Sequence, residues 1–243
     1  MTLNGKNMIN ASTLKNCLFF DVETATGFKD FPSLQQANPR LAKLWEKRCE
    51  YYRNAYSDLA EKSVDEIYMG KASLEPEFAR VVCVSFGTLD SSSELRMISF
   101  YGDDEIHILE KSCKVFRNAY TKGMKLAGHN IKGFDVACLG KRIIYTGVEE
   151  GTVPPNLNIW DKKPWDLPFL DSAEIFSFGN WVQQKYLSLD LLACSLGVES
   201  PKNNLDGSLV SHFFWELKEY DSIKDYCELD VKTVFEVMNK VSK

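Results

Sequence analysis

The chain lacks several features that would place it in a specialised class. Its seven cysteines include no C-x-x-C pair and mostly lie in apolar segments, so we expect reduced core residues in a cytoplasmic protein. No apolar run approaches the length of a membrane span, and residues 1–16 contain no signal-peptide core, so we expect neither an anchor nor a leader. Glycine, proline and charged residues occur at ordinary frequencies, which argues against collagen, coiled coil and long disorder.

The chain also lacks the positive charge of a protein that coats nucleic acid. Its formal net charge is -5 over 243 residues, which argues against non-specific binding through a large positive field. A nuclease is not excluded, because carboxylates that hold metal ions make an enzyme acidic while its substrate channel stays locally basic. With 44% hydrophobic residues the chain can bury one good core, so we expect a single domain over residues 1–243.

What the chain does contain is a pair of acids at the end of an apolar strand. The apolar run over residues 17–22, interrupted by one acid, predicts a buried strand near the middle of a sheet. Because side chains alternate along a strand, Asp21 and Glu23 project from the same face. Two such carboxylates repel one another and are costly to desolvate, and a shared divalent cation removes both penalties. The pair is therefore a candidate site for a hard metal ion.

The same spacing also arises by chance in a chain with 34 acids. Asp103 and Glu105 repeat it, but they follow a glycine and open an amphipathic segment, where acids cap a helix and complement its dipole. Taken alone, the pair Asp21 and Glu23 is explained equally well by a metal site and by chance. Further acids in suitable contexts decide between the two.

A second constellation follows a short strand predicted over residues 124–127. The segment 128–135 turns between glycines and enters a helix with Asp135 in its first turn. An acid there also complements the helix dipole, so a structural role stays open, and Asn130 is open to explanation as a turn residue. We expect His129 to be a hydrogen-bonded, partly buried histidine, because a carboxylate site for hard cations has little use for imidazole.

A third constellation lies on the last helix, predicted over residues 221–241. Tyr226 and Asp230 fall on its apolar stripe, one turn apart on one face. An unpaired carboxylate on a buried face costs several kcal/mol, so Asp230 needs a partner such as a metal ion. Tyr186 and Asp190 have the same spacing, but Ser188 starts a helix between them, so they do not share a face.

A long segment over residues 28–80 separates the first strand from the second. Asn38 caps a predicted helix with one apolar face and one solvent-exposed face. For the apolar face, packing against the rest of the protein is favoured over a role as a substrate clamp. Its apolar positions are Leu41, Leu44, Trp45, Tyr52, Ala55 and Leu59.

The loop over residues 147–170 is the other long irregular stretch. Its lysines and one tryptophan either contact a nucleic acid strand by charge and stacking or pack the loop onto the body. These residues are Lys162, Lys163 and Trp165.

Together, the three constellations resemble the Asp-Glu-Asp-Asp exonucleases of the ribonuclease H-like superfamily, in the branch that carries a tyrosine. The matching motifs are D-x-E at 21–23, N-x3-F-D at 130–135 and Y-x3-D at 226–230. The stretch 189–201 and the last helix are also similar to stand-alone exonucleases related to the proofreading domain of family B DNA polymerases. The resemblance covers most of the chain. It implies an α/β fold with a central mixed five-stranded sheet flanked by helices, and residues 28–80 as a partly helical insertion.

The resemblance also implies a 3′–5′ exonuclease that hydrolyses single-stranded DNA from its 3′ end. Two Mg²⁺ or Mn²⁺ ions would lower the pKa of the attacking water and stabilise the leaving 3′ oxygen. Their ligands would be Asp21, Glu23, Asp135 and Asp230.

The remaining site residues are assigned through the same resemblance. Tyr226 would orient the attacking water. Thr24 and Ala25, which follow the D-x-E motif, would contact the terminal nucleotide. Asn130 and Phe134 match positions near the substrate.

Two other interpretations stay open. RNase D-like exoribonucleases share this core, and the motifs do not encode contacts to the 2′-OH. A non-catalytic nucleic-acid-binding module would keep the fold but lack an acid, and none is missing. The chain leaves no room for a polymerase domain, so we expect a free-standing nuclease with no membrane partner.

Overall fold

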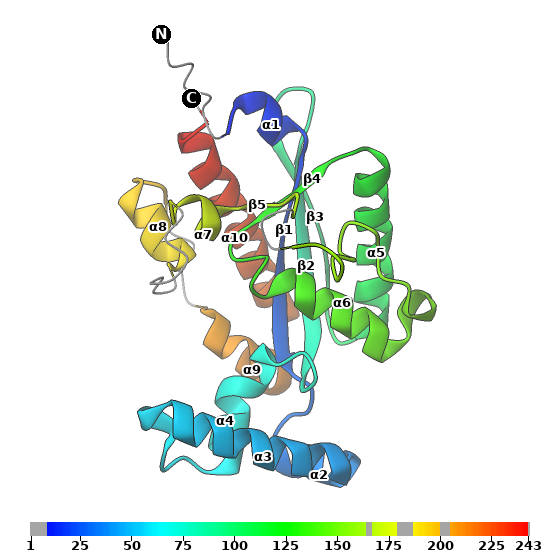
Figure 1. Ribbon diagram of the computed structural model, residues 1–243, viewed down its shortest axis with the longest axis vertical. Coiled ribbons are helices and arrows are strands. Elements are labelled where there is room, and N and C mark those ends of the chain that lie inside the picture. The colour runs from blue at the N-terminus through cyan, green and yellow to red at the C-terminus, as the bar shows by residue number, and fades with distance from the viewer. Residues whose placement is uncertain (1–8, 164–166, 179–186, 200–204, 243) are drawn as a thin grey trace.

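The computed structural model describes residues 9–163, 167–178, 187–199 and 205–242. Figure 1 shows a sheet with helices on both faces and a separate group of helices at one end. The strands lie in the order β3-β2-β1-β4-β5. Their bounds are β1 Cys17–Thr26, β2 Ala79–Leu89, β3 Leu95–Tyr101, β4 Lys125–Gly128 and β5 Leu170–Asp171. The mixed five-stranded sheet is therefore confirmed.

The central strand of this sheet is β1. It pairs antiparallel with β2 and parallel with β4, while β2 and β3 form the antiparallel hairpin and β4 pairs parallel with β5. The β1–β2 register shifts between Glu23 and Thr24, which face Cys83 and Val81 respectively. Val82 is the extra residue of this bulge, and bulges of this kind redirect the side chains that follow them.

Alternation along β1 divides its side chains between two cores. Leu18, Phe20 and Val22 pack with residues of α5 (Glu105–Thr121) and α6 (Asp135–Thr146). Cys17 and Phe19 pack with residues of α10 (Tyr220–Lys240) on the opposite face. Asp21 and Glu23 continue this second set, so the acids of β1 face α10.

Shorter helices complete the body of the molecule. They are α1 Ala11–Lys15, η3 Val148–Gly151, α7 Ser172–Ile175, α8 Leu189–Ser195, η5 Gly207–Leu209, α9 Val210–His212 and the π-helical turn η6 Phe213–Leu217. Among the described helices, none combines the length and the apolar content needed to cross a membrane.

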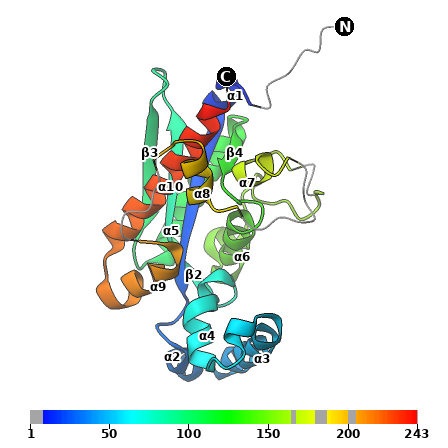
Figure 2. The same cartoon turned by 90° about the vertical axis from the view of Figure 1, so that its left-hand side faces the viewer.

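The insertion between β1 and β2 is helical, as predicted, and has its own small core. It contains α2 Phe31–Ala37, α3 Pro39–Ala55, η1 Ser57–Leu59, α4 Val64–Lys71 and η2 Ala72–Leu74. At its centre the fully buried Trp45 ring lies 4.7 Å from the Phe78 ring and 5.3 Å from the Tyr68 ring, centroid to centroid. Figure 2 shows α4 beneath the end of β2, on the same side of the molecule as α8 and α9.

The packed face of α3 differs in part from the predicted one. Asn38 caps the helix by accepting a hydrogen bond from the Leu41 amide, as predicted. The buried side chains are those of Ala42, Trp45, Cys49 and Tyr52. Leu44 and Ala55 are exposed, so their assignment to the packed face was wrong. Both fall outside the arc of the helix that Trp45 and Cys49 define, because one residue step turns a helix by about 100°.

Candidate active site

Side chains from all three sequence motifs line one cavity of about 600 Å³. The first pair of acids comes from β1, a third acid from the first turn of α6, and the fourth from α10. The motif residues on its wall are Asp21, Glu23, Asn130, Phe134, Asp135, Tyr226 and Asp230. The fold thus brings together acids that lie more than 200 positions apart in the chain.

The four acids repel one another strongly in this cavity. Burial, followed by the charge of Asp135, raises the pKa of Asp21. Burial and the charges of Asp21 and Asp230 raise the pKa of Glu23, which is only 8% exposed. For Asp135, which is 4% exposed, burial and the charges of Asp171 and Asp230 raise the pKa to about 7. Carboxylates in this state retain protons unless a cation offsets their charge.

Cys227 is a neighbour of the acids that the sequence analysis missed. One ligand atom each from Asp21, Glu23 and Cys227 lie within 4.8 Å of one another. The Cys227 thiol donates to Asp21 Oδ2 at 3.4 Å and to the Asp21 carbonyl at 3.5 Å. Burial raises the pKa of this thiol well above its usual value, so it acts as a donor and not as a ligand for hard cations. The only indication of this role in the sequence was that Cys227 lies on the same apolar stripe of the last helix as Asp230.

Tyr226 lies one turn before Asp230 on α10, and both residues line the cavity. Burial, followed by the charges of Asp230, Glu23 and Asp21, raises the pKa of Tyr226 above its ordinary value. The phenol therefore stays protonated over the whole physiological range and can serve only as a neutral hydrogen-bonding group.

A second residue that the sequence analysis missed is Asp171, which fixes the turn before α6. It is 2% exposed and accepts hydrogen bonds from the amides of Asn130 at 2.8 Å and Lys132 at 3.0 Å. Asn130 has φ of +57°, a conformation that asparagine adopts more readily than most residues. The turn residue is thus placed on the cavity wall by backbone contacts to a buried acid.

His129 has the structural role predicted for it. Its Nδ1 shares a hydrogen bond of 2.8 Å with Ser172 Oγ, and its Nε2 shares one of 2.7 Å with the Leu187 carbonyl. Both ring nitrogens are engaged within the fold, which confirms the expectation of a hydrogen-bonded, buried histidine.

Thr24 and Ala25 are not among the described residues that line the cavity. The Thr24 hydroxyl donates to the Ser73 carbonyl at 2.7 Å, and Ala25 is fully buried in a cluster with Val210 and Phe214. Alternation along β1 keeps Ala25 on the same face as Glu23, where it packs under α9, and turns Thr24 to the opposite face. Their contact with a terminal nucleotide stays a prediction.

Other wall residues had no motif to mark them. These are Leu74 from the insertion, Ser188, Leu189 and Asp190 around the start of α8, and Gly207. Ser188 caps α8 by accepting from the Leu191 amide, as predicted, yet Asp190 still faces the cavity.

The aromatic and basic residues noted in and after the long loop can be compared with this site only in part. Tyr186 and Trp165 lie outside the described residues. Lys162 and Lys163 are exposed and are not among the described residues that line the cavity.

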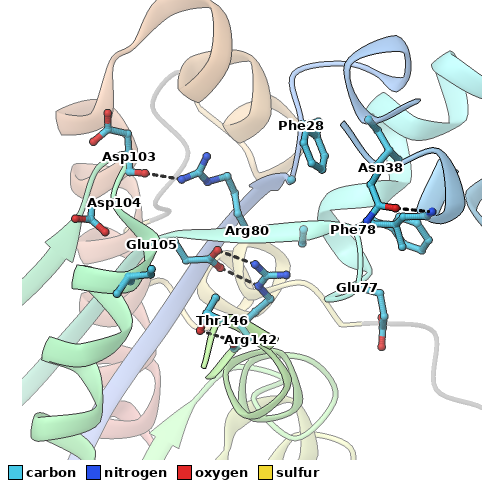
Figure 3. Close-up of a pocket in the computed structure, with 15 residues that line it drawn as sticks. Phe28, Asn38, Glu77, Phe78, Arg80, Asp103, Asp104, Glu105, Arg142 and Thr146 are labelled. Atoms are coloured by element: carbon cyan, nitrogen blue, oxygen red, sulfur yellow. Dashed lines mark hydrogen bonds and ion pairs between the residues drawn. The ribbon is translucent and has the colours of Figure 1, made fainter. Parts of the chain in front are cut away.

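The second D-x-E pair lies in a different cavity, of about 730 Å³, shown in Figure 3. Asp104, between the two acids, caps α5 by accepting from the His107 amide at 3.0 Å. Glu105 receives hydrogen bonds from Arg142 at 2.7 and 2.8 Å and from the Val81 amide at 2.8 Å. A guanidinium and an amide thus satisfy Glu105 without a metal ion, and the helix-capping role predicted for this segment is confirmed.

The mixed five-stranded sheet with helices on both faces is a ribonuclease H-like fold, and four acids from β1, α6 and α10 converge on one cavity. The chain belongs to a family of predicted 3′–5′ exonucleases related to the exonuclease domain of PolB, whose family model matches residues 72–242. The match includes Asp135, Tyr226 and Asp230 and begins after most of the insertion. It confirms the resemblance drawn from the sequence and makes the chain an exonuclease.

A solved structure supports the fold. The chain is similar to the family B DNA polymerase from the hyperthermophilic archaeon Pyrobaculum calidifontis, with a TM-score of 0.54 over 92% of this chain and 15% sequence identity. The similar region is 24% of that polymerase, so the chain spans about a quarter of its length. At this identity the likeness concerns the fold alone. No curated protein matches the chain significantly.

Proposed function

We propose that the chain removes nucleotides from the 3′ end of single-stranded nucleic acid, DNA in preference to RNA, by hydrolysing the terminal phosphodiester bond. The observation that carries this proposal is the convergence of four carboxylates and Tyr226 in one cavity. The relation to the exonuclease domain of a DNA polymerase supports DNA as the preferred substrate.

The donor set fits hard divalent cations. Carboxylate oxygens are the ligands that Mg²⁺ and Mn²⁺ prefer, and exonuclease domains of this kind use divalent metals. Burial and the charges of neighbouring carboxylates raise the pKa values of Asp21, Glu23 and Asp135, and a bound cation would offset both effects. We assign these three acids and Asp230 as ligands of two Mg²⁺ or Mn²⁺ ions, which when bound would supply Lewis-acid activation of the water and of the scissile phosphate.

The chain's own groups bind and orient the reactants. The protonated Tyr226 hydroxyl, one turn from Asp230 on the cavity wall, orients the attacking water. The Cys227 thiol positions the Asp21 carboxylate by donating a hydrogen bond to it. Phe134 and Leu189 give the cavity apolar surfaces against which a terminal base or sugar packs.

The first prediction concerns Asp21. A single-stranded DNA oligonucleotide labelled at its 5′ end should shorten from its 3′ end only when Mg²⁺ or Mn²⁺ is present. Asp21→Asn should lower this rate by about a thousandfold or more, because it removes a charged ligand. The readout is the product ladder on a sequencing gel, with a matched RNA strand run in parallel to test the alternative substrate.

The matched control is Asp104→Asn, which makes the same change in the other acidic segment. Asparagine caps helices as well as aspartate does, so this variant should fold and keep wild-type activity. Absence of metal-dependent shortening in the wild type, or shortening that survives Asp21→Asn, would rule out the proposed function.

A further inference from the structure

We propose that an exposed surface of the insertion binds the nucleic acid strand upstream of its 3′ end. The surface consists of the exposed Arg48, Tyr51 and Tyr56 and the half-buried Lys71, and we call it the tyrosine–cation surface. This inference rests on the proposed function, because it concerns a further part of the same substrate.

The helix that carries most of this surface concentrates positive charge on an acidic protein. Between Pro39 and Ala55, α3 has five lysines and arginines against two glutamates, a balance of +3, whereas the chain as a whole has -5. Helical spacing places Arg40, Lys47 and Tyr51 on one exposed side. The two glutamates lie toward the edge of that side. A positive stripe of this kind complements the phosphates of a nucleic acid.

Aromatic rings lie beside the cations of this surface. The side chains of Tyr51 and Tyr56 are 53% and 47% exposed. The Arg48 guanidinium carbon is 4.9 Å from the Tyr51 ring centroid, and Lys71 Nζ is 5.4 Å from the Tyr56 ring centroid. The buried Tyr52 connects the two exposed rings, at centroid distances of 5.8 and 6.0 Å. Exposed rings next to cations bind single strands by stacking on bases and pairing with phosphates.

Residues 73–75 link the surface to the active-site cavity. Glu75 Oε1 accepts from the Tyr52 hydroxyl at 2.5 Å and lies 2.6 Å from Arg48 Nη2. The preceding residue, Leu74, lines the cavity and is 56% exposed. The carbonyl before that, Ser73, is held to β1 by the Thr24 hydroxyl. The surface is therefore tied to the strand that carries Asp21 and Glu23, and a nucleic acid whose 3′ end lies in the cavity meets it on leaving.

The test measures binding to strands of two lengths without any metal ion. Fluorescence anisotropy in EDTA would follow single-stranded DNA of about 16 and about 4 nucleotides, labelled at the 5′ end, on the full chain. For the double variant with Tyr51→Ala and Tyr56→Ala we expect the Kd of the long strand to rise about tenfold or more, with the Kd of the short strand unchanged. The matched control is Tyr120→Ala, because Tyr120 is 56% exposed and lies on α5.

The outcomes separate this proposal from the proposed function. Equal long-strand affinity in the wild type and the double variant overturns the tyrosine–cation surface, even if the wild type is an active exonuclease. An equal loss on both strand lengths, or the same loss in the Tyr120→Ala control, also overturns it. Because binding is measured without hydrolysis, an inactive wild type overturns the proposed function alone. With Mg²⁺ added, the double variant should keep its kcat on the short strand and lose efficiency on the long one.

Discussion

At the scale of single residues, the molecule separates acids that accept hydrogen bonds from protein donors from acids that face other carboxylates. Glu105 is satisfied by Arg142 and a backbone amide, and Asp171 by three backbone amides. Asp21 and Asp135 instead face other carboxylates, and their pKa values rise. Carboxylates thus differ in pKa according to whether hydrogen-bond donors or other carboxylates lie beside them.

Tyr226 carries the prediction that belongs to this scale. Tyr226→Phe keeps the ring on the cavity wall and removes only the hydroxyl that we propose to orient the attacking water. We expect kcat to fall about tenfold to a hundredfold with the KM for the oligonucleotide nearly unchanged, because a positioning contact acts in the transition state. Steady-state kinetics and Mn²⁺ affinity measured on the same variant check this. A wild-type kcat in Tyr226→Phe would exclude the proposed role.

Part of the site could be predicted residue by residue from the sequence. The context of each acid was enough to separate Asp21 from Asp103, since one lies within an apolar strand and the other precedes a helix. Asp171 and Cys227 could not be found in this way, because their roles depend on which backbone amide or carboxylate the fold places beside them. Sequence spacing carries no information on such contacts between distant segments.

At the scale of elements, the close approach of β4 to β1 determines the path of the turn that leads into α6. A Cβ on Gly128, the last residue of β4, would lie 2.9 Å from the Phe20 carbonyl oxygen and 2.3 Å from Ile131 Cγ2. Only a glycine allows the turn over residues 129–134 to follow the strand so closely, and this turn places Asp135 beside β1.

The glycines of this region give a paired prediction. Gly128→Ala should lower the free energy of unfolding by about 1–3 kcal/mol, because the clash involves backbone. Gly140→Ala, within α6 and with only Val153 Cγ1 near the new Cβ at 3.9 Å, should raise it by about 0.5–1 kcal/mol. Urea denaturation of both variants checks the sign of each change. Equal stability of the two would contradict the packing described for Gly128.

The elements themselves followed from local patterns, with errors where packing decides. The apolar run predicted β1, the helical stripe predicted α10, and capping residues predicted the starts of α3 and α8. The face of α3 was partly wrong because an apolar residue such as Leu44 has no partner on its side of the helix. Periodicity shows that a helix has a buried face but not what covers its edges.

At the scale of the whole molecule, two packing units meet at the active site. The sheet and its helices carry the acids, while the insertion packs around Trp45 and contributes Leu74 to the cavity wall. The sequence predicted a helical insertion without a purpose, because a helical pattern does not show where an inserted segment docks. The structure places Leu74 of the insertion on the cavity wall, which the motifs did not indicate.

The pH dependence of metal binding follows from the whole charge cluster. Folding raises the pKa of Asp135 from 3.8 to about 7, so the metal-free folded protein holds a proton that the unfolded chain has already lost. Stability of the metal-free protein therefore falls as the pH rises from about 4 to about 7. A metal ion competes with this proton, so metal affinity should rise over the upper part of the same range.

The most direct measurement is a calorimetric titration of the metal-free protein with Mn²⁺ at pH 6 and at pH 8. The four-carboxylate cluster predicts two ions bound per chain, with an affinity at pH 8 at least about tenfold higher than at pH 6, and loss of binding in Asp230→Asn. The same affinity at both pH values, or undiminished binding in Asp230→Asn, would contradict the account.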